Sequence, residues 1–478
     1  MNRTADVVIV GAGVIGSATA FELAKRGYKT LNIDKLPASG YGSTSNSCAI
    51  VRAHYSTWDG VAMAYEGFFY WDDWNKYLEV EDERGMAKYM KTGSIMFMLK
   101  KIIVSFFCGF LLIVNNHAEQ NNSLSAALTK NIDLVIQNNI KGKKIPGAVV
   151  WIEKENLSYS QSYGKRCVTP SPKVMQKNTI FDAASLTKIM ATAPSIMILA
   201  EKERLSINDP IVKHLPKFKG HQKNKITIKQ LLTHTSGLPP VLPLKPKWKG
   251  YQHAINLCYS ASINKVPGRY FRYSDVNFIL LGEIIQKISG VSLKSFVEKE
   301  IFDPLEMKDT CFLPSKSNLY RIAPTTKEKG KLVHGIVHDP TARAMGGIAG
   351  HAGLFTTASD LAKYCRMIIN NGSIGDIKVL SKNSIDIMTK IQTSMVSHKV
   401  GRGLGWDIDS QYSSPRGEGF PKYESFGHTG WPGGSVWIHP KSKSFVILMT
   451  NRNHPFERRS IKPLRMEIGT LTAKSFGF

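Results

Sequence analysis

The sequence has few cysteines and few acidic residues for its length. Its 478 residues include six cysteines, with no CxxC pair and no metal-ligand spacing, so we expect buried free thiols, no disulfide framework and no metal site. The 37 Asp and Glu are outnumbered by 63 Lys and Arg, giving a formal net charge of +26. An anionic polymer, a lipid surface or a lysine-rich solvated face would each account for this charge. Basic-aromatic motifs, finger spacings and internal repeats are also lacking, so we expect no nucleic-acid partner.

The most informative motif is S-x-x-K, within the segment FDAASLTKIMATAPSIMILAEK (181–202). On a helix, this spacing places Ser185 and Lys188 on one face, a turn apart. The lysine amine could then reach the serine hydroxyl and, where burial lowers its proton affinity, accept the serine proton. The alternatives are a helix N-cap serine and a surface lysine, although the apolar neighbours favour a buried lysine.

Two later segments strengthen this interpretation. The sequence FRYSDVN (271–277) precedes the apolar FILLGEII, and GHTGW (427–431) precedes the strand-like GGSVWIHP. Tyr273 could relay protons beside a cation that lowers its pKa, or it could be a core aromatic residue. The His-Thr-Gly edge, which includes His428 and Gly430, offers a hydroxyl and backbone N–H groups to a substrate carbonyl.

The order S-x-x-K, Y-S-x, H-T-G resembles the penicillin-recognising serine hydrolases over about residues 121–478. The closest branch holds class C β-lactamases, D-alanyl-D-alanine carboxypeptidases, esterases and D-aminopeptidases. The resemblance implies that Ser185 forms an acyl-enzyme while Lys188 and Tyr273 move protons. The backbone N–H groups of Ser185 and Trp431 would form the oxyanion hole.

The resemblance also implies the substrate class. We expect a small molecule or peptide, such as a cell-wall fragment: a peptidoglycan-type D-amino-acid peptide, a β-lactam or a small ester. Hydrolysis would need no cofactor. The sequence leaves ester, amide and lactam open, and a non-catalytic penicillin-binding module is an alternative function.

Two positions depart from the β-lactamase pattern. Asp275 replaces the commoner asparagine, and its charge would keep Lys188 protonated and shift base duty towards Tyr273. Alternatively, Asp275 points away and Asn277 takes the polar role. His428 replaces the lysine of K-T-G, which favours carboxypeptidases, D-aminopeptidases and esterases over a dedicated β-lactamase. We expect protonated His428 to hold a substrate carboxylate; the remaining candidates, His234, His351 and His439, are interpreted as structural.

The order of elements predicts an α+β fold of the β-lactamase and penicillin-binding-protein type. Strands at both ends enclose a helix-rich middle that runs to about residue 375, so the terminal strands should share one antiparallel sheet flanked by helices. The motifs would meet at the edge of this sheet, beside the helical region. The expected helices are 123–139 and 461–476, and the expected strands are 146–152, 157–163, 435–439 and 444–450.

The N-terminal segment carries a different signature. A strand at 7–10, a GAGVIG turn, a helix and a strand ending in an acid predict a partial Rossmann-like βαβ unit. The glycines would admit a pyrophosphate and the acid would bind a ribose hydroxyl; these cofactor-binding candidates are Gly11, Gly13, Gly16 and Asp34. With GYGSTSNSCAIVR (40–52), the segment resembles FAD-dependent oxidoreductases of the D-amino-acid-oxidase type. An FAD-dependent oxidoreductase is therefore an alternative function. Because the resemblance stops near residue 97, we expect this segment to be a truncated fragment without turnover.

The join between the two signatures resembles a secretory signal peptide. Lys100 and Lys101 lead into the apolar run 102–114, and a small residue follows at Ala118. A buried core helix is the alternative. Residues 1–97 carry 10 Lys and Arg against 11 Asp and Glu, so all of the excess positive charge lies in the remainder.

This contrast in charge is expected of two genes joined by fusion, rearrangement or a gene-model error. With the signal-like segment, we expect three parts: 1–97, 98–118 and 119–478. A product that starts at Met98 would be periplasmic or secreted. The fused chain would be membrane-anchored or cytoplasmic, with membrane contact through 102–114.

Overall fold

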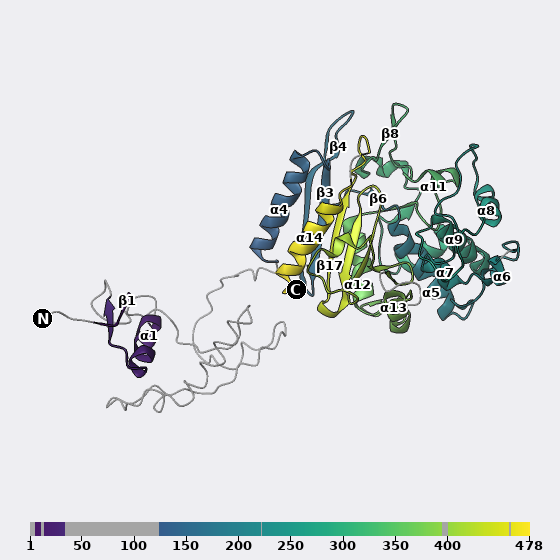
Figure 1. The fold of residues 1–478 in the computed structure, drawn as a ribbon. Helices are drawn as coiled ribbons and strands as arrows, with labels where there is room; N and C mark the ends of the chain where they lie inside the picture. Colours follow the sequence, from purple (N-terminus) through teal and green to yellow (C-terminus); the bar gives the residue numbers. More distant parts are fainter. Residues whose placement is uncertain (1–4, 11–13, 34–123, 221, 394–399, 458–459) are drawn as a thin grey trace, which may run out of the picture. The chain divides into compact units, whose positions relative to one another are not determined.

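A computed structural model describes residues 5–10, 14–33, 124–220, 222–393, 400–457 and 460–478 (Figure 1). The chain divides into two compact units, Met1–Asn116 and His117–Phe478. The signal-like segment 98–118 lies outside the described residues, as do Gly11, Gly13 and Asp34.

The first unit contains the predicted strand–helix–strand. Strand β1 (Val7–Val10) and strand β2 (Thr30–Ile33) are connected through helix α1 (Val14–Lys25). The strands pair in parallel with Val7 opposite Thr30, and parallel neighbours joined by a helix define a βαβ unit. The partial Rossmann-like unit is therefore confirmed, with Gly16 in the first turn of α1.

The second unit is built on an eight-stranded antiparallel sheet of order β13-β14-β15-β16-β17-β3-β4-β5. Its central strands are continuous apolar runs, and every residue of β16 and β17 is buried. The predicted sharing of one sheet by both ends of the domain is confirmed, because β17 pairs with β3 from Ser444 opposite Lys154 to Thr450 opposite Ala148. The strands are β3 (Gly147–Lys154), β4 (Leu157–Cys167), β5 (Lys173–Val174), β13 (Gly401–Arg402), β14 (Asp407–Asp409), β15 (Phe426–Thr429), β16 (Ser435–His439) and β17 (Ser444–Thr450).

The two terminal helices of the second unit cover one face of this sheet. Figure 1 shows helices α4 (Ala126–Lys141) and α14 (Lys462–Ser475) side by side. They bury an apolar cluster against the sheet, including Ile132, Trp437 and Leu464. Helix α4 begins later than predicted because the Ser125 side chain accepts a hydrogen bond from the Leu128 N–H and caps the helix.

The opposite face of the sheet packs against a larger core that continues into the helical region. Helix α12 (Ala358–Ile369) lies against β3 and β17, and α9 (Asp275–Ser289) is largely buried at the centre of the helical region. The predicted helix-rich middle is confirmed. Its other helices are α5 (Ala193–Glu201), α6 (Ile211–His214), α7 (Ile228–Leu232), α8 (Tyr251–Ser260), α10 (Leu293–Val297), α11 (Pro340–Ala344) and α13 (Lys382–Thr389).

Short strands that the sequence did not indicate lie within this region. A three-stranded antiparallel sheet has the order β6-β10-β7, and it carries the chain into the S-x-x-K segment. The short strands are β6 (Phe181–Asp182), β7 (Cys311–Phe312), β8 (Lys327–Glu328), β9 (Lys331–Leu332), β10 (Leu354–Thr356), β11 (Ser373–Ile374) and β12 (Ile377–Lys378).

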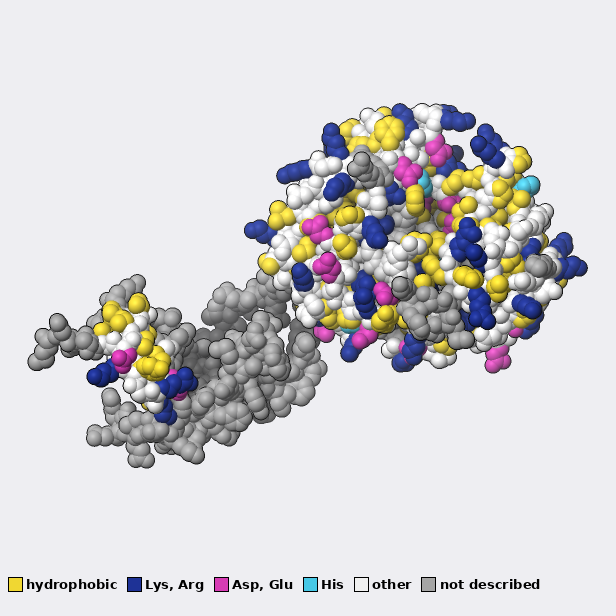
Figure 2. Space-filling model, viewed as in Figure 1, with side chains coloured by type: hydrophobic (Ala, Val, Ile, Leu, Met, Phe, Trp, Pro, Cys, Tyr) yellow, Lys and Arg dark blue, Asp and Glu magenta, His cyan; other side chains and the backbone are white. Residues whose placement is uncertain are grey.

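Three sequence properties have structural counterparts in the described ranges. Cysteines 167, 258, 311 and 365 are all free, and two of them are buried. Figure 2 shows lysine and arginine side chains spread over the visible face of the second unit, which favours the solvated-face explanation of its charge. No single described helix has the length and apolar character to cross a membrane; one pair bent by 78°, Asp275–Ser289 with Leu293–Phe302, meets the criteria of length and composition.

Candidate active site

Ser185 lies in a tight turn between strand β6 and the following helix. The preceding residue, Ala184, has φ +45°, in the left-handed region that residues with a side chain rarely occupy. The helix opens as a π-helical turn, Lys188–Thr192, with Thr187 as its N-cap, and such turns are frequent at functional sites. Leu186 and Thr187 are already helical, so Ser185 stands directly before the first residue of the helix.

The serine and the lysine of the S-x-x-K motif are in direct contact. The Lys188 Nζ donates a hydrogen bond to the Ser185 Oγ at 3.0 Å and a second to the His351 carbonyl oxygen at 3.0 Å. The Lys188 side chain is fully buried. The geometry thus places an amine within proton-transfer distance of a serine hydroxyl.

Asp275 controls the charge of Lys188. Its Oδ1 lies 2.8 Å from the Lys188 Nζ, and Ser274 caps the helix that Asp275 begins. Burial on its own lowers the pKa of Lys188, but Asp275 and Tyr273 outweigh it, so the pKa is raised above its ordinary value. Lys188 is therefore an ammonium at neutral pH.

Asn277 does not replace Asp275 as the polar group beside Lys188, which was the alternative interpretation of this segment. Its Oδ1 accepts a hydrogen bond from the Ser236 Oγ at 2.6 Å and its Nδ2 donates to the Leu231 carbonyl. This buried amide joins α9 to the segment beside α7, while Asp275 points to the lysine.

Tyr273 connects the lysine to the H-T-G strand. The Lys188 Nζ lies 5.0 Å from the centre of its ring, within cation–π distance. The ring stacks on His234 at 4.3 Å and lies 6.0 Å from the ring of His428. Tyr273 is thus packed among aromatic rings and also lines the cavity that contains Ser185.

The structure corrects the expected charge of His428. Its side chain is 4% exposed, and burial, followed by Arg402 and Lys188, lowers its pKa well below the ordinary value. This direction favours a neutral ring at neutral pH and argues against the expectation that a protonated His428 holds a substrate carboxylate. Its Nδ1 lies 2.9 Å from the Thr429 carbonyl, so Nδ1 carries the proton and Nε2 remains an acceptor.

Two arginines that the sequence did not single out lie beside the H-T-G segment. Arg465, from α14, is partly buried, and its Nη2 donates to the carbonyl oxygens of Gly430 and Gly434 at 2.8 and 2.9 Å. Burial, followed by Arg452, lowers the pKa of Arg465 to about 9. Arg452 lies over the Trp431 ring at 5.1 Å and donates to its carbonyl oxygen. Neither arginine belongs to a recognisable motif.

A cavity of about 950 Å³ joins these groups. Of the seven predicted catalytic residues, six line it: Ser185, Tyr273, Asp275, His428, Gly430 and Trp431. Lys188 lies beneath Ser185, and the Trp431 side chain is 59% exposed. The three motifs, far apart in sequence, therefore meet at one site, and Arg452 and Arg465 line the same cavity.

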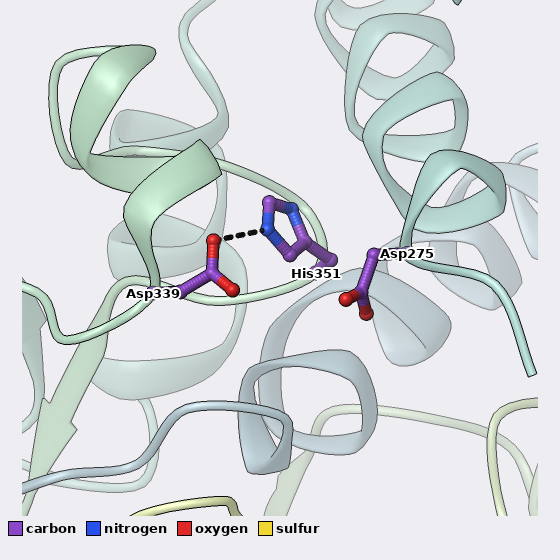
Figure 3. A group of neighbouring side chains, drawn as sticks. All are labelled: Asp275, Asp339 and His351. Atoms are coloured by element: carbon purple, nitrogen blue, oxygen red, sulfur yellow. Dashed lines mark hydrogen bonds and ion pairs between the residues drawn. The ribbon is translucent and has the colours of Figure 1, made fainter. Parts of the chain in front are cut away.

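A group of potential metal ligands also borders the cavity. Asp275, Asp339 and His351 present ligand atoms within 4.8 Å of one another, and Figure 3 shows the ion pair between the His351 Nε2 and the Asp339 Oδ1, at 2.9 Å. The Lys188 ammonium already lies 2.8 Å from the Asp275 carboxylate. A divalent ion here would be repelled by this buried cation, so we assign no metal to the group.

Comparison with known proteins agrees with this geometry. The family model described as Beta-lactamase matches residues 132–470. The chain belongs to the β-lactamase family. This is a serine hydrolase family, and the family predicted from the three motifs is confirmed. A second model, FAD dependent oxidoreductase, matches residues 6–97.

The relatives agree with this membership. A protein of Salmonella heidelberg (strain SL476) named as a D-alanyl-D-alanine carboxypeptidase is 28% identical over 352 residues, which cover 67% of this chain and 80% of the relative. A protein of Salmonella typhi with the same name has the same identity and coverage.

Solved structures share the fold of the second unit. A class C β-lactamase matches with a TM-score of 0.61 and 21% identity, over 75% of this chain and all of its own. A hydrolase with promiscuous acyltransferase activity matches with a TM-score of 0.59 and 20% identity, over 72% of this chain and 98% of its own. The predicted fold class is confirmed.

Proposed function

We propose that residues 119–478 form a hydrolase that acts through an acyl-enzyme on peptidoglycan-type D-amino-acid peptides, with β-lactams and small esters as related substrates. The observation that carries the proposal is the 3.0 Å contact between the buried Lys188 Nζ and the Ser185 Oγ. The contact lies beside a cavity that is large enough for a peptide terminus.

The charge state of Lys188 sets the proposed proton path. Because Asp275 holds Lys188 as an ammonium, the lysine cannot take the serine proton itself. Tyr273, reacting as a phenolate beside this ammonium, accepts that proton and becomes a neutral phenol as the Ser185 Oγ attacks the carbonyl carbon, and the ammonium stabilises the negative charge that forms on the carbonyl oxygen. The proton then passes to the leaving group as its bond breaks, and water later releases the acyl group.

The backbone at the cavity wall would stabilise the tetrahedral intermediate. The N–H groups of Ser185 and Trp431 are the proposed oxyanion donors. In place of His428, Arg465 is the group proposed to pair with a substrate carboxylate, because its Nε is buried without a hydrogen-bond partner among the described residues. Guanidinium–carboxylate pairs are charge-assisted and specific in geometry. This pairing favours peptides with a free carboxyl terminus.

The test is intact-mass analysis after incubation with penicillin, p-nitrophenyl esters and D-Ala-D-Ala peptides. We expect a covalent adduct on Ser185, and the variant Ser185→Ala should lose the adduct and at least about 10³-fold in turnover. The matched control is Ser195→Ala, which removes a buried serine hydroxyl bonded to the Ala191 carbonyl on the next helix. This control should keep the adduct.

Two outcomes would contradict the proposal. Turnover in Ser185→Ala above about a tenth of wild type would exclude Ser185 as nucleophile. Substrate binding without any adduct or turnover would instead favour the non-catalytic penicillin-binding module.

The first unit supports a narrower proposal. The FAD dependent oxidoreductase match and the β1–α1–β2 unit fit the phosphate-binding start of a dinucleotide site, because α1 begins directly after the glycine turn. We propose no oxidoreductase turnover for it, since the match ends at residue 97.

A further inference from the structure

The turn that presents Ser185 is held in a conformation that its sequence does not favour. Ala184, directly before the nucleophile, has φ +45°, and alanine has no intrinsic preference for this left-handed region. Such conformations persist where surrounding contacts impose them. The contacts around Ala184 therefore bear on the position of Ser185.

The carboxylate of Asp182 supplies the principal contact. Its Oδ1 accepts a hydrogen bond from the Ala184 N–H at 2.8 Å, and its Oδ2 accepts one from the His338 N–H at 2.6 Å. The side chain is 4% exposed, and the backbone of Asp182 is fixed by its pairing with Phe355 in the three-stranded sheet. One buried carboxylate thus joins two segments that are distant in sequence.

The second segment leads back to the lysine. Asp339 follows His338 and binds the His351 ring at 2.9 Å, while the His351 carbonyl accepts a hydrogen bond from the Lys188 Nζ at 3.0 Å. The contacts therefore form a closed circuit from the Ser185 turn through Asp182 and the 338–351 segment to Lys188. Both ends of the Ser185–Lys188 hydrogen bond depend on this circuit.

We propose that Asp182 is a positioning residue that fixes Ser185 against Lys188 by holding the Ala184 and His338 N–H groups together. It does not line the cavity, so it would act through the nucleophile turn and not on the substrate. The proposal rests on the proposed function, in which Ser185 is the nucleophile.

The ionised form of Asp182 is the one that can hold both donors. In a protonated carboxyl group, one oxygen carries a hydrogen and acts as a donor. That O–H would face one of the two backbone N–H donors, so their hydrogen bond would be weakened. Burial raises the pKa of Asp182 to about 6, against the lowering effect of the hydrogen bonds from His338 and Ala184. The charged neighbours are Asp339, which raises this pKa, and Arg343, which lowers it. The contact should therefore weaken as the pH falls through about 6.

The first test compares Asp182→Asn with a matched control, Asp360→Asn. The asparagine amide would face one of the two N–H donors, so one hydrogen bond is lost. Asp360 is also buried and accepts from the Asp309 N–H and the Thr310 hydroxyl, at 2.8 and 3.0 Å, but does not line the cavity. With a p-nitrophenyl ester, kcat should fall by about 10²-fold in Asp182→Asn, while KM changes by less than about 3-fold. Asp360→Asn should keep kcat within about 2-fold.

A second variant tests the role of the strained turn. Glycine adopts positive φ readily, so Ala184→Gly in the Asp182→Asn background should recover part of the lost kcat. The wild-type pH profile gives an independent measurement, because kcat should decline below about pH 6 while circular dichroism remains native. This acid limb should be absent from Asp182→Asn.

Each outcome supports or overturns the positioning role. A loss in Asp182→Asn that is below about 3-fold, or equal to that of Asp360→Asn, would overturn it. If Asp182→Asn does not fold, a wild-type profile that is flat between pH 5 and 7 would overturn it. Failure of the proposed function can be told apart from failure of the positioning role, because wild-type Ser185 would then form no adduct with penicillin or esters.

Discussion

The buried ion pair between Lys188 and Asp275 permits a sharp test of the site's electrostatics. The Lys188 Nζ and the Asp275 Oδ1 are 2.8 Å apart, and the lysine side chain is fully buried. The variant Asp275→Asn removes the negative charge and keeps the size of the side chain. An ammonium is then left in a buried position without its opposing charge.

The expected cost follows from the separation. At an effective dielectric constant of about 20, unit charges 2.8 Å apart attract by about 6 kcal/mol. Breaking a buried pair by removing one partner usually costs about 3–5 kcal/mol, since the remaining group relaxes or changes its protonation. We therefore expect the free energy of unfolding of Asp275→Asn to be about 3–5 kcal/mol lower than wild type at pH 7.

The sign of the pH dependence is fixed by the direction of the pKa shift. In the wild type, the Lys188 pKa lies above the ordinary 10.5, so the stabilisation is complete below pH 10.5 and is lost as the pH rises through the folded-state pKa. In Asp275→Asn, the carboxylate that opposed the effect of burial is gone, so burial lowers the pKa of Lys188. The variant then gains stability with rising pH, and its difference from wild type narrows towards pH 10.

The assay is urea unfolding of both proteins between pH 7 and 10. The matched control is Asp407→Asn, which breaks the buried Arg402–Asp407 pair, 3.1 Å apart. Because a guanidinium is a much weaker acid than an ammonium, the loss of stability in the control should change less with pH than the loss in Asp275→Asn. The reasoning would be refuted if the free energy of unfolding of Asp275→Asn were less than about 1 kcal/mol below that of wild type at pH 7. It would also be refuted if this difference did not change with pH.

Other predictions concern His428 and the first unit. Since burial lowers the pKa of His428 well below its ordinary value, kcat/KM for carboxylate-bearing peptides and for neutral esters should show parallel pH profiles between pH 6 and 8, below the Arg465 pKa of about 9. A fall in kcat/KM with rising pH for the peptides alone would instead support a protonated His428 that binds the substrate carboxylate. A chain starting at Glu119 should keep the hydrolase activity and melting temperature of the full chain, measured by scanning fluorimetry; an insoluble or inactive product would disprove independence. The full chain should purify without stoichiometric flavin absorbance, and one equivalent of flavin per chain would overturn this.

The long elements of the fold could be predicted from the sequence because their patterns are strong. Strand β17 is a run of seven buried residues, and the predicted bounds of β16 and β17 are those observed. Strand β6 has two residues, too few to show an alternating pattern. Its sheet depends on pairing with β10, which comes from a distant part of the chain.

The site was predictable where its residues form motifs. Ser185, Lys188 and Tyr273 stand in such motifs, and the structure brings them together. Arg465 was missed because a basic residue on a terminal helix usually faces solvent, whereas this side chain is partly buried and donates to the Gly430 carbonyl. The lowered pKa of His428 could not be predicted from the sequence because it depends on burial and on Arg402 and Lys188, which only the tertiary structure places beside the ring.

The pairing of β3 with β17 has a consequence for synthesis on the ribosome. The Thr450 hydroxyl donates to the Gly147 carbonyl across 303 residues of chain. At typical translation rates the first strand waits about 15–60 s for its partner. During that interval we expect β3 and β4, which pair directly, to form a hairpin with an open apolar edge, while Ser185, Lys188 and Tyr273 leave the ribosome. A nascent chain that stalls before Thr450 should therefore recruit chaperones, because such edges invite aggregation.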